Sequence, residues 1–140
     1  MSVDANKQLY RRWLLELWNG NLAITDQVVT PDFVGSWPGR PGLVHGPKEL
    51  AEIIRMSRDI FLEVTFAVEV GPVAEGDLVA ARWIGHGSYN GGMRGTTAPA
   101  GARVSFSGHD LLRVEEGRFA EYWVISETEH LLAQLQASPS

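Results

Sequence analysis

The chain has 140 residues, of which 44% are hydrophobic and 21% charged, and its formal net charge is −5. A chain of this length buries about two-thirds of its unfolded surface, so we expect one domain over residues 1–140. No apolar run approaches the roughly 18 residues of a membrane helix, and the scattered basic residues argue against a nucleic-acid partner. The lack of cysteine and a polar N-terminus predict a soluble cytoplasmic protein whose partners are small molecules or proteins.

Helical periodicity dominates the first third of the chain. Apolar residues recur at helical spacing after Asp4, which can cap the helix, and Asn19-Gly20 supplies a stop. A second long helix begins after Gly46-Pro47, where proline is tolerated in the first turn. The elements predicted here are helices over residues 5–18, 22–29 and 48–58, a strand over 33–37, and a turn-rich loop over 37–42.

After Phe61 the hydrophobic period changes to two, which is typical of strands. The predicted elements are strands from 61 to 70, 78–88, 104–114 and 118–125, then a helix over 127–135 and a frayed end over 137–140. The glycine-rich stretch 90–102 is predicted to be a mobile loop that covers a cavity. Helices followed by strands predict an α+β fold, in which a curved antiparallel sheet wraps around the N-terminal helices and encloses a cavity.

Asp110 stands out because it shares strand parity with Phe106, Leu112 and Val114. This face is apolar or small, so we expect it to be the concave face and Asp110 to point into the cavity. With Gly117 closing the hairpin, Asp110 is predicted to pair with Tyr122. A buried carboxylate must be hydrogen-bonded, protonated or solvated, and its pKa is thereby tuned for acid/base chemistry. The alternative is a structural aspartate tied to Tyr122 or Ser107.

Other polar residues are weaker candidates. His86 could titrate near neutrality and is a third candidate catalytic group, although its parity matches Arg82 and favours the wetter face. His109 points away from Asp110 because neighbours on a strand face opposite sides, and Arg113 with Glu121 is expected to form an outer ion pair. The spread of the four histidines predicts no metal site.

Aromatic residues are numerous for one small domain, and most are expected to be core. Trp37, beside a proline- and glycine-rich loop, is placed to flank a pocket mouth. Planar aromatic walls suit a polycyclic or polyene ligand. The residues predicted to bind substrate are Trp18, Trp37, Tyr10, Ile53, Met56, Phe106 and Val124, and Met93 could add adaptable surface.

The order and spacing of several short segments resemble the SnoaL-like polyketide cyclases, a family of the nuclear-transport-factor-two-like superfamily, over nearly the whole chain. The segments are LLELWNGNL (14–22), TPDFV (30–34), HGPKEL (45–50), VAEGDLVAARW (73–83), GHDLLRVEEGRFAEYW (108–123) and LLAQL (131–135). The resemblance implies a deep apolar cavity, chemistry on small hydrophobic molecules without a cofactor, and a homodimer through the outer face of the sheet.

The family's catalytic residues transfer only in part. The resemblance places the acid/base aspartate of aromatic-polyketide cyclases at Val124, their cavity asparagine near Ile53 and their cavity histidine at Asp110. A cavity tyrosine of the family falls at Trp18. The general base of the related ketosteroid isomerases falls at Trp37, and no strand carries the arginine and aspartate of limonene-type epoxide hydrolases.

Three functions remain open. The leading hypothesis is cyclisation or isomerisation of a hydrophobic metabolite, with Asp110 as acid/base and Tyr122 as its hydrogen-bond partner, aided by a cavity that holds the substrate in its reactive shape. Epoxide-hydrolase-type water addition would need Arg82 or His86 to face inward. A non-catalytic binding module is favoured by the lack of acid/base groups at Val124 and Ile53.

Overall fold

The computed structural model describes residues 2–136, so the predicted fraying of residues 137–140 lies outside the described part. Helices and strands follow the expected order. The elements are α1 (Val3–Arg11), the π-helical segment η1 (Arg12–Leu17), the 3₁₀ turn η2 (Leu22–Ile24), α2 (Thr25–Val28), β1 (Val29–Ser36), β2 (Val44–His45), α3 (Gly46–Arg58), β3 (Phe61–Glu75), β4 (Leu78–Tyr89), β5 (Arg103–Glu115), β6 (Arg118–Ser126) and α4 (Thr128–Gln136).

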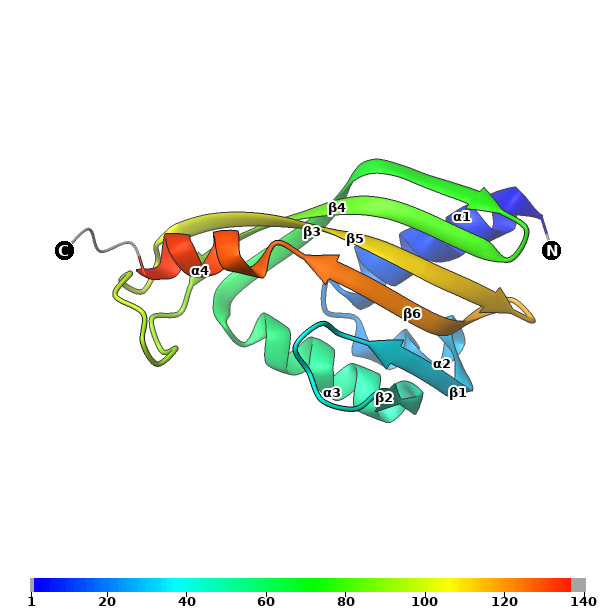
Figure 1. Ribbon diagram of the computed structural model, residues 1–140, viewed down its shortest axis with the longest axis horizontal. Coiled ribbons are helices and arrows are strands. Elements are labelled where there is room, and N and C mark those ends of the chain that lie inside the picture. The colour runs from blue at the N-terminus through cyan, green and yellow to red at the C-terminus, as the bar shows by residue number, and fades with distance from the viewer. Residues whose placement is uncertain (1, 137–140) are drawn as a thin grey trace.

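Six strands form one curved, unclosed sheet in the order β2-β1-β6-β5-β4-β3 (Figure 1). The long strands β3 to β6 pair antiparallel, as predicted. However, β1 runs parallel to β6, so the sheet is mixed rather than wholly antiparallel. The helices α1 and α3 pack on the sheet, α1 against β3 and α3 against β1, and the α+β prediction is confirmed. None of the helices in residues 2–136 is long and apolar enough to cross a membrane.

The first helix begins earlier and ends differently than predicted. Ser2, rather than Asp4, caps it by accepting a hydrogen bond from the Ala5 N–H at 2.9 Å. After Arg11 the helix widens into η1, where the Trp18 N–H donates to the carbonyl of Trp13, five residues back. Such wide turns occur mostly as short insertions in α-helices. This one turns both tryptophans inward.

The β5–β6 hairpin has a different register from the predicted one. Asp110 pairs with Val124, and Leu112 pairs with Tyr122. One residue of the difference arises at the turn, where Glu115 pairs with Arg118, and the other from the ladder shift between Arg113 and Val114. The predicted pairing of Asp110 with Tyr122 was therefore wrong by two residues. A shift of two preserves side-chain parity, so both residues still face the same side of the sheet.

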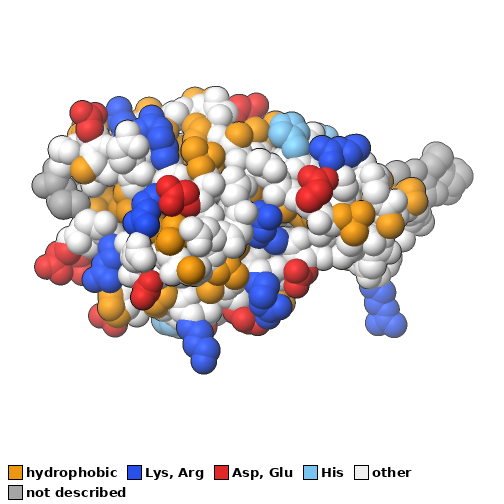
Figure 2. All heavy atoms as spheres, turned by 180° about the vertical axis from the view of Figure 1, so that it is seen from behind, with side chains coloured by type: hydrophobic (Ala, Val, Ile, Leu, Met, Phe, Trp, Pro, Cys, Tyr) orange, Lys and Arg blue, Asp and Glu red, His pale blue; other side chains and the backbone are white. Residues whose placement is uncertain are grey.

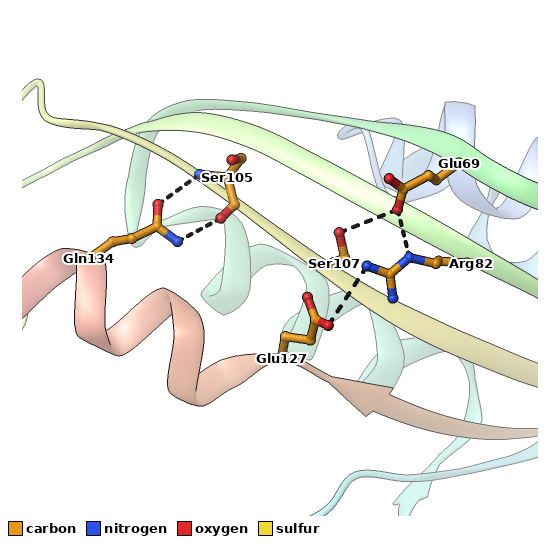
Figure 3. Close-up of polar contacts among 6 residues, drawn as sticks. All are labelled: Glu69, Arg82, Ser105, Ser107, Glu127 and Gln134. Carbon is orange, nitrogen blue, oxygen red and sulfur yellow. Dashed lines mark hydrogen bonds and ion pairs between the residues drawn. The ribbon is translucent and has the colours of Figure 1, made fainter.

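Two side-chain amides clamp the sheet to its flanking helices. Asn19, just after η1, accepts from the Phe66 N–H at 2.7 Å and donates to its carbonyl at 3.1 Å. Gln134 of α4 binds both backbone groups of Ser105, at 3.1 and 2.8 Å, beyond the point where β6 ends (Figure 3). The C-terminal helix is thus fixed to β5, and its Leu135 carbonyl accepts from Thr97 and Ala98 of the glycine-rich loop.

Charged side chains of both signs are interspersed on the surface. The face opposite that of Figure 1 shows acidic, basic and apolar groups side by side (Figure 2). On the outer side of the sheet, the expected ion pair joins Arg113 Nε to Glu121 Oε1 at 2.7 Å. Apolar side chains gather on the inner side, between the sheet and the helices, where Trp13, Tyr10 and Phe33 are completely buried.

Candidate functional site

A cavity of about 220 Å³ lies between the concave face of the sheet, η1 and the end of α3. Its floor is apolar and buried, whereas Trp37, Ser57 and Ser126 near its mouth are half-buried. The predicted cavity therefore exists and is not filled by the tryptophans. The lining residues are Leu14, Trp18, Trp37, Ser57, Ile60, Phe61, Phe66, Trp83, Phe106, Asp110, Tyr122, Val124, Ser126, Thr128 and Leu131.

Aromatic rings form the wall of the cavity on β3, β4 and β5. Phe61 stacks on Phe106 with an interplanar angle of 3° and centroids 5.6 Å apart. Trp83 meets Phe66 and Phe106 edge to face, with centroids 5.5 and 5.6 Å away. Such contacts hold rings in fixed orientations. A flat apolar ligand would therefore find a rigid aromatic wall.

Asp110 is the one acidic residue that lines this cavity within the described chain, and it is only 3% exposed. Three donors surround its carboxylate. Trp83 Nε1 and the Tyr122 hydroxyl both donate to Oδ1, each at 2.9 Å, and the Tyr10 hydroxyl donates to Oδ2 at 2.9 Å. The donors come from β4, β6 and α1. The carboxylate therefore joins the sheet to the first helix.

Burial and hydrogen bonding have opposite effects on this carboxyl group. Burial raises the pKa of Asp110 from 3.8 to about 6, and the hydrogen bonds from Tyr122, Tyr10 and Trp83 limit the rise, with a further contribution from Trp13. Burial and the adjacent carboxylate together raise the pKa of Tyr10 and Tyr122 above the ordinary 10. Near neutral pH the group is thus a base surrounded by neutral donors.

Several predicted site residues do lie together. Asp110, Tyr122, Trp18, Trp37, Phe106 and Val124 line the cavity. Trp37 also packs edge to face on Tyr122 with centroids 5.1 Å apart. Tyr10 does not line the cavity but lies behind it as a donor to Asp110.

Other predicted residues lie elsewhere. His86 is exposed on the outer face, because the inward positions of β4 are held by Gly85 and Gly87 on either side of it. Met56 is 56% exposed on α3, and Ile53 is half-buried, without lining the cavity. The structure therefore does not bring the catalytic candidate His86 or the substrate-binding candidates Met56 and Ile53 to the cavity wall, since strand parity turns His86 outward and the helix turns Met56 toward solvent.

Arg82 also lies on the outer face, where it is bound on two sides. Its Nε contacts Glu69 at 2.7 Å, and its Nη2 lies 3.7 Å from Glu127 (Figure 3). It therefore cannot face Asp110. Within residues 2–136, no three His, Cys, Asp or Glu side chains come together as a group that could hold a metal ion.

Trp83 is the residue of this site that the sequence did not single out. Its indole N–H donates to Asp110 inside the cavity. The pairing of β4 with β5 would have indicated this contact. Trp83 lies opposite Gly108, which is two residues before Asp110 and on the same face of the sheet. An indole opposite a glycine can lie flat across the neighbouring strand.

The fold agrees with the comparisons to known proteins. The sequence model described as SnoaL-like polyketide cyclase matches residues 8–135, and the chain belongs to this family. No curated protein sequence matches the chain.

Solved structures share the fold over nearly the whole chain. A candidate SnoaL-like polyketide cyclase from Jannaschia sp. CCS1 superposes with a TM-score of 0.84 at 20% identity, covering 97% of this chain and 94% of its own. IdmH, a candidate polyketide cyclase from Streptomyces antibioticus, superposes with a TM-score of 0.80 at 28% identity, covering 93% of this chain and 97% of its own. AclR from Streptomyces galilaeus, named as a candidate hydroxylase, superposes with a TM-score of 0.82 at 24% identity, covering 99% of this chain and 85% of its own.

Proposed function

We propose that this protein binds a hydrophobic, polyketide-like metabolite in the cavity and catalyses its cyclisation or isomerisation without a cofactor, using Asp110 as the acid/base. The observation that carries the proposal is a single carboxylate, buried at an aromatic cavity wall, whose pKa is raised to about 6. At pH 7 such a group is ionised by about ten to one, and it is close to the pKa that general catalysis favours.

The proton balance of such a reaction closes on Asp110 alone. The carboxylate removes a proton from an acidic C–H of the substrate and returns it to another atom of the product, so no co-reactant is consumed. Three donors occupy three of the roughly four acceptor positions of a carboxylate, with two on Oδ1 and one on Oδ2. The rigid wall supplies the rest of the rate by holding the substrate in shape.

Comparison with the implied family pattern supports the same residue. The resemblance places the acid/base aspartate of aromatic-polyketide cyclases at Val124 and their histidine at Asp110, and these two positions are direct cross-strand partners. The ionisable group has thus been kept on β5 and lost from β6. Water addition lacks support, because Arg82 and His86 both lie outside the cavity.

Base strength inside the cavity can be measured with a probe that needs no knowledge of the natural substrate. 5-Nitrobenzisoxazole is flat and apolar; a base removes its C–H proton as its N–O bond breaks, releasing a coloured cyanophenolate. We expect the wild-type protein to accelerate this step, with a rate that rises with pH, is half-maximal near pH 6 and levels off about one unit above it. Asp110→Asn should lose about 100-fold of the acceleration.

The control variant is His86→Ala, which should keep the full rate because His86 is exposed on the outer face. Equal rates for the wild-type protein and Asp110→Asn would contradict the proposal. If both proteins then also bound the probe with the same affinity, the cavity would function as a binding module without turnover.

We also propose that two copies associate through the outer face of the sheet, as the family resemblance implies. Trp123, Leu111 and Ile125 are 40%, 40% and 63% exposed there. Apolar side chains that cluster on one surface are typical of protein–protein contacts.

A further inference from the structure

Gly108 lies on the concave face of β5, directly opposite Trp83 of β4. A Cβ atom at Gly108 would stand 2.3 Å from Cζ2 and 2.7 Å from Cε2 of the Trp83 indole. Non-bonded carbon atoms settle about 3.5–4.0 Å apart. Any side chain at this position would thus force the indole to move by about 1 Å.

The crowded part of the indole is the part that contacts the carboxylate. Cε2 is covalently bonded to Nε1, and Nε1 donates to Asp110 Oδ1 at 2.9 Å. Since N–H···O bonds fall in the range of about 2.7–3.2 Å, a displacement of about 1 Å breaks this contact. The missing side chain of Gly108 is therefore a condition for the hydrogen bond.

Trp83 differs in kind from the other two donors. An indole N–H can only donate, whereas a tyrosine hydroxyl can reverse and accept. As long as Trp83 is seated, it donates to Oδ1 and so favours the ionised carboxylate. Removal of Trp83 would take this donor away and would strengthen proton binding.

We infer that Gly108 is a positioning residue for Asp110: by lacking a side chain it seats the Trp83 indole against Oδ1, and thereby sets the proton affinity of the carboxylate. A role of Gly108 in catalysis rests on the proposed function, whereas its effect on the proton affinity of Asp110 does not. Within residues 2–136, the titratable groups facing Asp110 are Tyr10 from α1 and Tyr122 from β6, and both stay neutral below pH 10.

The test is the pKa of Asp110 measured without any substrate, by following its carboxyl ¹³C resonance through a pH titration. In Gly108→Ala we expect the pKa to rise from about 6 by about one unit, a tenfold change in the acid dissociation constant. Trp83→Phe should show the same rise, and Gly108→Ala in the Trp83→Phe background should add little.

Gly85→Ala is the matched control. Its Cβ meets the rings of Phe66 and Phe106 at 3.0–3.1 Å, and neither ring donates to Asp110. The pKa should stay near 6. The indole N–H resonance of Trp83, assigned from its loss in Trp83→Phe, should move farther in Gly108→Ala than in Gly85→Ala.

Each outcome decides. An unchanged pKa in Gly108→Ala or in Trp83→Phe overturns the inference. If Gly108→Ala does not fold, recovery of the fold in the double variant supports it, whereas failure of both overturns it, since the Ile125 carbonyl 2.8 Å from the added Cβ would then dominate. If the pKa rises in Gly108→Ala but Asp110→Asn reacts with the probe as fast as the wild-type protein, the inference stands and the proposed function is contradicted.

Discussion

Asp110 carries two roles that conflict energetically. As a structural group, it accepts hydrogen bonds from Tyr10, Trp83 and Tyr122 and so connects three elements. As a buried ionised group, it opposes folding, because a charge is costly away from water. For the anion, the cost of burial outweighs the gain from the hydrogen bonds, which gives the carboxylate its raised pKa.

This balance predicts how stability depends on pH. The folded protein holds the Asp110 proton more tightly than an unfolded chain, whose aspartate has a pKa near 3.8. The stabilisation from Asp110 is therefore complete below about pH 4 and is lost as pH rises through 6. We expect the loss between pH 4 and 7 to be about 2–3 kcal/mol, from about 1.4 kcal/mol for each unit of pKa difference.

Urea unfolding of the wild-type protein and Asp110→Asn at several pH values measures this contribution. The difference in the free energy of unfolding between the two proteins should fall by that amount from pH 4 to 7, since all other groups cancel. A difference that is flat with pH, or that rises, would show that the folded state does not favour the neutral acid.

At the scale of elements, α4 is held by polar contacts and by buried leucines. Gln134 supplies two hydrogen bonds to Ser105, and the Leu135 carbonyl accepts from the glycine-rich loop. Leu131 and Leu135 are buried, and Leu131 lines the cavity. The helix therefore closes one end of the cavity, and the Gln134 amide is its polar link to β5.

Gln134→Ala should loosen α4 without unfolding the domain. Each lost hydrogen bond is worth about 1 kcal/mol, so the amide of Ser105 should exchange with solvent deuterium at least about tenfold faster. Native-state hydrogen exchange followed by NMR checks this. His130→Ala on the same helix is the control, since the His130 side chain is exposed, and should leave the exchange of Ser105 unchanged.

Element order and strand parity could be predicted from the sequence, because periodicity depends on which side chains are buried. Asp110 was placed on the inner face on that basis, and it lies there. Features that depend on contacts distant in sequence were missed. No local sequence pattern indicates the ladder shift at Arg113 or the parallel pairing of β1 with β6. The same holds for the hydrogen bond from Tyr10 to Asp110, because the two residues lie 100 positions apart.

On the scale of the whole molecule, the sheet has two unlike faces. The inner face surrounds the cavity, and the outer face carries ion pairs such as Arg113–Glu121 beside exposed Trp123 and Ile125. A homodimer through this face would cover the exposed apolar side chains and leave the cavity unaffected. Such a dimer would keep the contact between the two copies apart from the cavity.

Sedimentation at several protein concentrations tests the dimer. We expect the wild-type protein to sediment as a dimer at micromolar concentration and Ile125→Lys as a monomer, because a buried unpaired charge is costly. Met56→Lys is the control: Met56 is 56% exposed, close to the 63% of Ile125, but lies on α3. If the wild-type protein and both variants form dimers with the same dissociation constant, the interface lies elsewhere.

The amide clamp at Asn19 has a consequence for the chemical lifetime of the protein. Asparagine followed by glycine is a thermolabile pair, since the glycine nitrogen can attack the side-chain amide and expel ammonia. Here both amide atoms of Asn19 are engaged with Phe66, and the Gly20 N–H is bound to the Leu17 carbonyl at 3.0 Å. Folding thus shields the pair from deamidation. Stored samples should age at this position only as fast as the edge strand β3 detaches from the first helix.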